Sequence, residues 1–238
     1  MTPAYILHSR AYRETSLLLE LFTLEHGRVA AIARGAKRKN SPWNGALSAF
    51  LPLCIQLVGK GDLLTLTLAE ASDSLAPPAL VGTSLVCGLY INELLLRTLQ
   101  RNAPVPDIFI LYQQTLNDLK KTKHLDITLR TFEKKLLMHL GYALNLKTEA
   151  ESSNAIQPDQ HYQWIHSHGL SQTQQSMPGN TSIFLGRHLL AFENDDYQDP
   201  QTRQAAKRLM RLALQPLLGD RALKTRELLT PAFRQKKG

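Results

Sequence analysis

The first 75 residues of the chain follow the pattern of short, half-buried β-strands. Leucine and threonine alternate from Leu63 to Leu68, which is the period of two expected for a strand with one buried face. Three other apolar segments are separated by sequences typical of turns and loops: 15–22, 28–33 and 49–58. About five short strands in about 75 residues predict a small β-barrel, and the OB-fold fits that count.

After Pro77 and Pro78 the apolar residues repeat at helical spacing. The pattern predicts helices over these segments: 80–100, 107–121, 126–140, 201–217 and 221–229. The stretch 147–199 is rich in Ser, Gln, Asn and His, and it is predicted to be an irregular insert with short strands or turns. The expected fold class is therefore α+β, with an OB-fold domain at 1–78 and an α-helical domain at 79–238.

Composition narrows the classes of protein that remain. The 238 residues are 43% hydrophobic and 20% charged, as in an ordinary globular protein. Two cysteines are present, too few for a disulfide framework or a four-cysteine zinc site. No apolar run reaches the length of about 18 residues that a membrane span needs, and the N-terminus lacks the pattern of a signal peptide. We therefore expect a cytoplasmic protein with no membrane contact.

The charge is uneven along the chain. The formal net charge is +8, but residues 151–199 carry −5 and residues 200–238 carry +8. A basic excess favours an anionic partner such as nucleic acid or an acidic peptide. The sequence motifs of phosphate-binding loops, zinc proteases and serine hydrolases are absent, and no carboxylate pair stands out as a general acid and base. We therefore expect a binding protein that is not an enzyme.

Three histidines in the insert raise the alternative of a metal site. His161, His166 and His168 could bind zinc, but no acidic or sulfur ligand stands at a recognised spacing. A solvated polar loop is the favoured interpretation, and no cofactor is expected.

The loop that joins two predicted strands concentrates positive charge. Four cations lie within six residues of it: Arg34, Lys37, Arg38 and Lys39. Trp43 follows in the same loop, and cations beside an aromatic ring suit phosphate contacts combined with base stacking. The alternative for Trp43 is packing beneath its own loop. Four residues near the N-terminus could extend the same DNA-binding face: Tyr5, Arg10, Tyr12 and Arg13.

A second group of cations lies on two predicted helices. One stripe of helix 201–217 has a spacing of four residues: Arg203, Lys207 and Arg211. Helix 126–140 carries two cations and an apolar stripe: Arg130, Lys134, Phe132 and Leu136. Two such helices predict a groove for a short acidic peptide with an aromatic anchor. The alternative is a pair of ordinary amphipathic helices with solvated basic edges.

Six segments that span nearly the whole chain form a recognisable set. In chain order they are AYILHSRAYRETSLLLELFTLEHGRVAAIARGAKR, SAFLPLCIQLVGKGDLLTLTLAE, GLYINELLLRTL, LRTFEKKLLMHLGYALNL, RQAAKRLMRLAL and LGDRALKTRELL. Together they resemble the RecO family of bacterial recombination mediators. The resemblance is weak only over about 148–185.

The resemblance implies an N-terminal OB-fold, an α-helical domain and a non-enzymatic role in the RecF pathway of DNA repair and recombination, within the response to DNA damage and the SOS response. Proteins of this family bind single- and double-stranded DNA and anneal complementary strands. With RecR they help to load RecA onto DNA covered by the single-stranded DNA-binding protein, SSB, with RecF and RecA as indirect partners. The expected location is the cytoplasm, in association with the nucleoid.

The resemblance also implies a site for the acidic, Phe-ending tail of SSB. Arg130 matches the arginine of the family element L-R-x-F-E-x-x-L-L that takes part in that contact. The grouping of Lys134, Arg203 and Lys207 around the same site is inferred from their spacing alone.

One departure from the family concerns zinc. Many members carry a four-cysteine zinc element in the insert, whereas residues 142–190 of this chain contain no cysteine. Zinc is therefore not expected, and the insert must be held by packing. Three other classes of protein stay open: an RNA-binding OB-fold protein, a scaffold without a nucleic-acid role, and a nuclease, which is disfavoured because no acidic metal-binding cluster is visible.

Overall fold

The structure, a computed structural model, consists of two compact units. One unit contains Met1–Thr122 and Arg221–Gly238, and the other contains Lys123–Asp220. The structure describes the chain except for residues 42, 44, 73–78, 167, 175–179 and 235–238, and except for the side chains of 230, 231, 233 and 234. The predicted domain boundary at residue 78 therefore lies outside the described residues.

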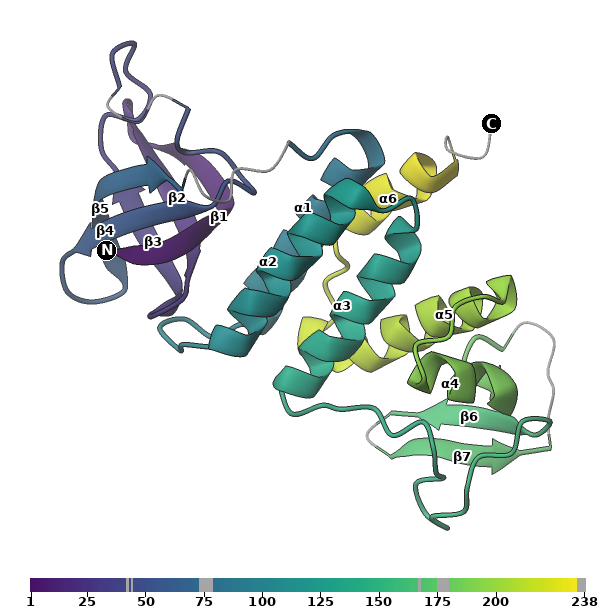
Figure 1. The fold of residues 1–238 in the computed structure, drawn as a ribbon. Coiled ribbons are helices and arrows are strands. Elements are labelled where there is room, and N and C mark those ends of the chain that lie inside the picture. Colours follow the sequence, from purple (N-terminus) through teal and green to yellow (C-terminus); the bar gives the residue numbers. More distant parts are fainter. Residues whose placement is uncertain (42, 44, 73–78, 167, 175–179, 235–238) are drawn as a thin grey trace. The chain divides into compact units, whose positions relative to one another are not determined.

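The first unit begins with a closed five-stranded barrel (Figure 1). Its strands are β1 (Thr2–Tyr12), β2 (Ser16–Thr23), β3 (Gly27–Ala33), β4 (Leu53–Val58) and β5 (Leu63–Ala71), in the order β1-β2-β3-β5-β4. Only β3 and β5 pair in parallel. The predicted barrel is confirmed. The strand expected from residue 49 begins at Leu53, because Phe50 has a φ of 66° that no extended strand adopts.

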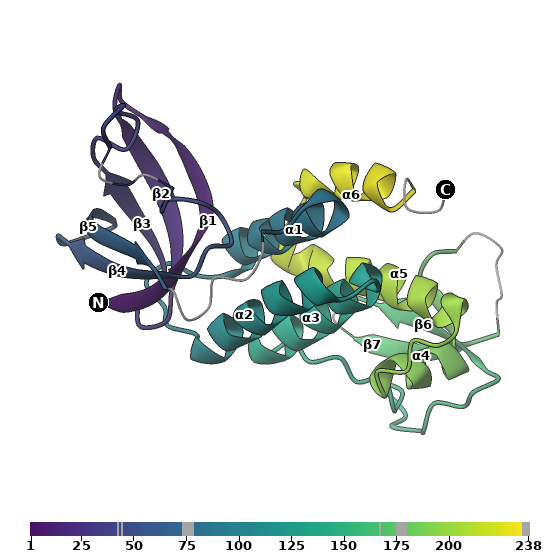
Figure 2. The same ribbon diagram turned by 45° about the horizontal axis from the view of Figure 1, so that its top comes forward.

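Three helices belong to the same unit as the barrel (Figures 1 and 2). They are α1 (Gly82–Thr98), α2 (Pro106–Lys121) and α6 (Thr225–Arg234). Asn92 of α1 donates to the Leu7 carbonyl of β1 at 3.0 Å and accepts from the Tyr112 hydroxyl of α2 at 2.7 Å. Burial raises the pKa of Tyr112 well above its ordinary value, which keeps its hydroxyl protonated as the donor. This hydrogen-bonded chain fixes the two helices against the barrel.

A second contact joins the β2–β3 hairpin to the segment between α1 and α2. Asn102 donates its backbone N–H to the Arg28 carbonyl at 2.9 Å. Gly27, at the hairpin turn, has a φ of 65°, and a Cβ there would overlap the Ala103 carbonyl. Glu20 forms ion pairs with Arg28 and Arg101 on the same side. The barrel is therefore held at two places by the elements that follow it in sequence.

Helix α6 starts four residues later than predicted because a distant carboxylate caps it. Glu93 of α1 accepts the backbone N–H groups of Lys224 and Thr225, each at 2.9 Å, and the Thr225 hydroxyl at 2.6 Å. Burial raises the pKa of the Glu93 carboxyl, but these hydrogen bonds outweigh burial and leave the pKa below its ordinary value.

We expect Glu93→Gln to lower the free energy of unfolding by about 1 kcal/mol at neutral pH, the size of a lost N-terminal cap. Because the folded-state pKa is lowered, the contribution of Glu93 is complete above the ordinary glutamate pKa of about 4.3. It is lost as the pH falls through the lower pKa of the folded state. Urea unfolding of the parent and of Glu93→Gln, at neutral pH and near pH 3, tests this. The same difference in free energy of unfolding at both pH values would contradict it.

The second unit combines three helices with a small sheet. Its elements are α3 (Leu125–His139), β6 (His161–Ile165), β7 (Gly169–Thr173), β8 (Ile183–Leu185), α4 (Gly186–Glu193) and α5 (Pro200–Leu218). The antiparallel sheet has the order β7-β6-β8, and α5 packs against both α3 and α4. Gly141, with a φ of 84°, follows the C-cap of α3, as predicted. The insert contains the short strands that were expected, and α4 in addition.

Candidate functional site

One end of the barrel presents the predicted DNA-binding cations. They lie at the end of β1, in the β1–β2 turn and in the loop after β3, and we call them the barrel basic group: Arg10, Arg13, Arg34, Lys37, Arg38 and Lys39. The backbone N–H of Lys37 donates to the Thr15 carbonyl at 2.9 Å, so the loop is fastened to the turn. This bond brings cations separated by about twenty positions into one surface.

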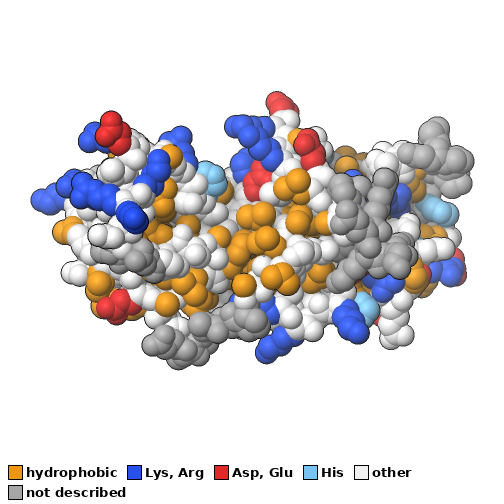
Figure 3. Space-filling model, turned by 90° about the horizontal axis from the view of Figure 1, so that it is seen from above, with side chains coloured by type: hydrophobic (Ala, Val, Ile, Leu, Met, Phe, Trp, Pro, Cys, Tyr) orange, Lys and Arg blue, Asp and Glu red, His pale blue; other side chains and the backbone are white. Residues whose placement is uncertain are grey.

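The barrel basic group is open to solvent and to ligands. All six residues are exposed, and Figure 3 shows blue side chains gathered over the barrel at the left of the view. Within the described part of the chain, no carboxylate forms an ion pair with any of them. Exposed cations without a carboxylate partner can neutralise an external anion, and six in one place suit a chain of phosphates.

The structure contradicts base stacking by Trp43. Its side chain is 9% exposed and belongs to the barrel core. The indole N–H donates to the Arg34 carbonyl at 3.0 Å, so the ring anchors the loop from beneath. The alternative interpretation, packing under its own loop, fits the observed position. Tyr5 is also buried, against Phe109 and Tyr112, and cannot extend the surface.

The second predicted site lies in the other unit, where α3 and α5 pack together. Phe132 and Leu136 of α3 are fully buried in the core of this unit. They therefore cannot line an open groove, and that part of the prediction is wrong. The helical spacing identified the apolar stripe correctly, but the same stripe is used to join the helices of the unit.

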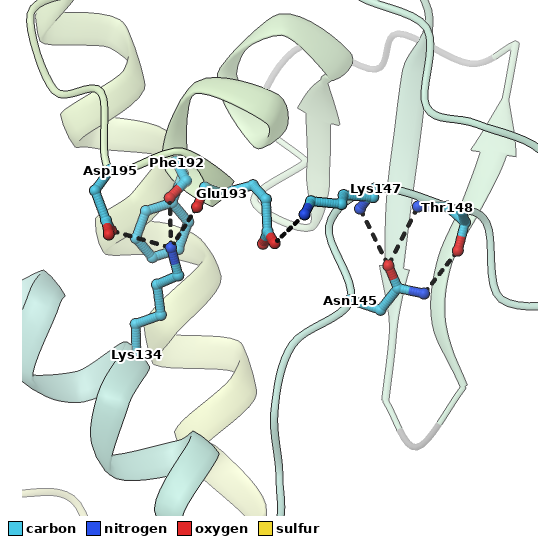
Figure 4. A network of polar contacts seen from close by, with 7 residues as sticks. All are labelled: Lys134, Asn145, Lys147, Thr148, Phe192, Glu193 and Asp195. Carbon is cyan, nitrogen blue, oxygen red and sulfur yellow. Dashed lines mark hydrogen bonds and ion pairs between the residues drawn. The ribbon is translucent and has the colours of Figure 1, made fainter.

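Lys134 is bound within the protein (Figure 4). Its ammonium group donates to the carbonyl oxygens of Phe192 and Glu193 at 2.9 and 2.7 Å and to the Asp195 carboxylate at 3.0 Å. It also lies 5.3 Å from the centre of the Phe192 ring. Lys134 therefore caps the C-terminus of α4, where backbone carbonyls favour a cation. This contradicts its prediction as a peptide ligand.

The other predicted cations come together on α3 and α5. Arg130 donates to Glu133 at 2.7 Å, and Arg203 lies 3.7 Å from Asp126. Desolvation lowers the pKa of Lys207, and the charges of two neighbouring cations lower it further. Those neighbours are Arg211 and Arg130.

The four predicted cations on α3 and α5 differ in how far they are exposed to solvent. Lys207 and Arg211 are exposed, Arg203 is half-buried and Arg130 is buried. Glu133, which sequence reasoning did not single out, is fully buried as the partner of Arg130. The spacing of three residues between them is the signal that could have found the pair. The part of the predicted site that can meet a ligand is therefore the edge of α5.

Two of the three candidate zinc-binding histidines line a cavity, whereas His161 begins β6. His166 and His168 line a cavity of about 580 Å³ together with Tyr142, Trp164 and Pro216. Among the residues that the structure describes, no group of three His, Cys, Asp or Glu side chains could hold a metal ion. The same described residues include no helix long and apolar enough to cross a membrane.

A closed five-stranded barrel followed by a helical region defines an α+β protein of the OB-fold class. Residues 1–75 match the family described as "Recombination protein O N terminal", and residues 81–227 match "Recombination protein O C terminal". The chain therefore belongs to the RecO family, and this membership supports a role in DNA repair and recombination.

Curated relatives agree over nearly the full length. A "DNA repair protein RecO" from Nitrosospira multiformis is 43% identical over 228 residues, which cover 95% of this chain and 93% of the relative. One from Coxiella burnetii strain RSA 493 is 43% identical, covering 96% and 97%. One from Actinobacillus pleuropneumoniae serotype 3 is 41% identical, covering 94% and 92%.

Proposed function

We propose that this chain is a non-enzymatic recombination mediator that binds single- and double-stranded DNA through the barrel. The exposed barrel basic group, whose members form no ion pair with a described carboxylate, is the observation that carries the proposal. Its cations contact phosphates, and each contact releases condensed counterions from the nucleic acid. Because phosphates are common to all sequences, binding is independent of base sequence.

Strand annealing follows from the same contacts. Two complementary strands repel each other through their phosphates, and cations on one protein surface reduce that repulsion. Contacts to the backbone leave the base edges free to pair. No covalent bond is made or broken, so the activity needs neither a catalytic residue nor a cofactor.

The edge of α5 is proposed to bind the acidic tail of SSB. Lys207 and Arg211 are exposed there, and Arg203 lies on the same helix. The buried Phe132 and Leu136 cannot hold the aromatic end of the tail. The cavity lined by Tyr142 and Trp164, in the same unit, offers aromatic surface for it instead. Tail binding would concentrate the protein on exposed single strands by tethering.

The remaining elements of the proposal concern partners and location. The protein acts with RecR to load RecA onto strands coated by SSB, and RecF takes part indirectly. It works in the cytoplasm at the nucleoid, during the response to DNA damage and within the SOS response. These steps rest on membership of the RecO family.

Fluorescence anisotropy with two labelled ligands tests the proposal. We expect the full chain to bind a dT oligomer, with a slope of log affinity against log salt of roughly −3 for about four phosphate contacts. An acidic peptide ending in Phe should bind without displacing the DNA, because the two sites lie on different units. A DNA affinity insensitive to salt would contradict the barrel site. Tighter binding to RNA of the same sequence would instead favour an RNA-binding protein.

A further inference from the structure

Burial of Trp43 leaves one aromatic side chain beside the barrel basic group. In the barrel-containing unit, seven described Phe, Tyr and Trp side chains are buried: Tyr5, Phe22, Trp43, Phe50, Tyr90, Phe109 and Tyr112. Tyr12 is the single described aromatic of this unit that is not buried. Among the described side chains of this unit, Tyr12 is therefore the aromatic residue that can contact a ligand.

Tyr12 lies beside the turn that carries part of the barrel basic group. It ends β1, pairs with Ser16 across the β1–β2 turn, and is followed directly by Arg13. Arg10 stands two positions earlier on β1 and projects to the same side of the strand. The loop with Lys37 is fastened to Thr15 in the same turn. Both sequence segments that carry the cations therefore meet at the β1–β2 turn, next to Tyr12.

The Tyr12 ring is in contact with the side chain of the next residue. The guanidinium carbon of Arg13 lies 5.4 Å from the centre of the Tyr12 ring, within the range of a cation–π contact. Arg13 adopts a φ of 54°, an uncommon conformation for a residue with a side chain. The guanidinium and the ring are therefore close enough for Arg13 to add positive charge beside the ring.

We propose that Tyr12 stacks against an unpaired base of single-stranded DNA, and that this contact makes the protein bind single strands more tightly than duplex. The inference rests on the proposed DNA binding by the barrel basic group. Phosphates are present in both forms of DNA, so cations alone discriminate poorly. Bases in a duplex are already stacked and paired, whereas an unpaired base can stack on an aromatic ring. A tyrosine among cations therefore adds affinity for single strands alone.

The test compares Tyr12→Leu with Tyr12→Phe in the full chain. We expect Tyr12→Leu to bind a dT oligomer about tenfold more weakly, within the range of one base stacked on one ring, and Tyr12→Phe to bind within about twofold of the parent. Affinity for a duplex of equal length should stay within about twofold for both. The salt dependence should not change, because neither substitution removes a charge.

A spectroscopic signal separates stacking from a structural effect. An oligomer containing 2-aminopurine loses fluorescence when the modified base stacks, and we expect this quenching with the parent and Tyr12→Phe but not with Tyr12→Leu. Arg13→Gly is the control for charge, since glycine adopts the required φ without strain. It should reduce the salt slope by about 0.7 and retain the quenching.

Two outcomes overturn the inference. One is an equal loss of single-strand and duplex affinity in Tyr12→Leu, with an unchanged melting temperature. The other is retention of both the affinity and the quenching in that variant. The proposed function survives either result if replacement of Lys37, Arg38 and Lys39 still abolishes DNA binding. If removal of those three cations has no effect, the proposed DNA site itself fails.

Discussion

Replacement of Lys37, Arg38 and Lys39 together by Ala is expected to weaken binding of single-stranded DNA about a hundredfold near 0.1 M salt. Each phosphate contact on a single strand contributes about 0.7 to the salt slope, and so about a fivefold change in affinity at that salt concentration. The salt slope should fall by about 2. All three side chains are exposed, so the melting temperature should not change.

The chain offers a matched control for total charge. Lys121, Lys123 and Lys135 are exposed lysines that lie outside the barrel, and their joint replacement by Ala removes the same three charges. We expect that variant to bind DNA within about threefold of the parent, because salt screens charges that make no direct contact with the phosphates. An equal loss in both triple variants would mean that net charge, and not the barrel basic group, drives DNA binding. Binding of the acidic peptide should survive in the barrel variant.

Arg130→Ala is expected to lower the free energy of unfolding by about 3 kcal/mol, because it removes the guanidinium from a buried ion pair. The Glu133 carboxylate is fully buried and lies 2.7 Å from Arg130. Removing one member of such a pair leaves a charge in a site that water does not reach. Urea denaturation at neutral pH measures the loss.

Two further variants check this explanation. Arg203→Ala should cost less than about 1 kcal/mol, since its ion pair with Asp126 is partly exposed to solvent. Replacement of both members, Arg130→Met with Glu133→Leu, should recover most of the stability, because an apolar pair leaves no unpaired charge. A double variant as unstable as Arg130→Ala would show that the charge of Glu133 is not the cause. Peptide binding is therefore better tested with Lys207→Ala and Arg211→Ala, which leave the buried pair in place.

The barrel and most helices could be predicted because their apolar residues repeat with a clear period. Alternation at Leu63–Leu68 gave a strand, and Gly141 marked the end of α3. Helix α4 was missed because a segment of eight residues in a polar stretch is too short for a helical period to stand out. Helix α6 starts at Thr225 and not at the predicted residue 221, because Glu93, far away in sequence, supplies its cap.

For the candidate sites, sequence located the charges but not the direction in which side chains point. The exposure of the six barrel cations could be predicted, because a charged side chain without a buried partner stays in solvent. Trp43 and Lys134 were both predicted to contact a ligand, but Trp43 is buried under its own loop and Lys134 caps a helix. Both outcomes depend on tertiary contacts, to the Arg34 carbonyl and to the end of α4. Local pattern carries no information on such contacts.

The chain leaves the barrel-containing unit after Thr122 and returns to it at Arg221. During synthesis on the ribosome, the barrel, α1 and α2 are therefore made about one hundred residues before α6, which accepts and donates hydrogen bonds with the side chains of Thr83 and Glu93 of α1. Until that last helix emerges, one side of α1 stays uncovered and the unit is incomplete. A premature stop codon that removes only α6 would thus damage the barrel-containing unit, although every strand of the barrel and every member of the barrel basic group had already been translated.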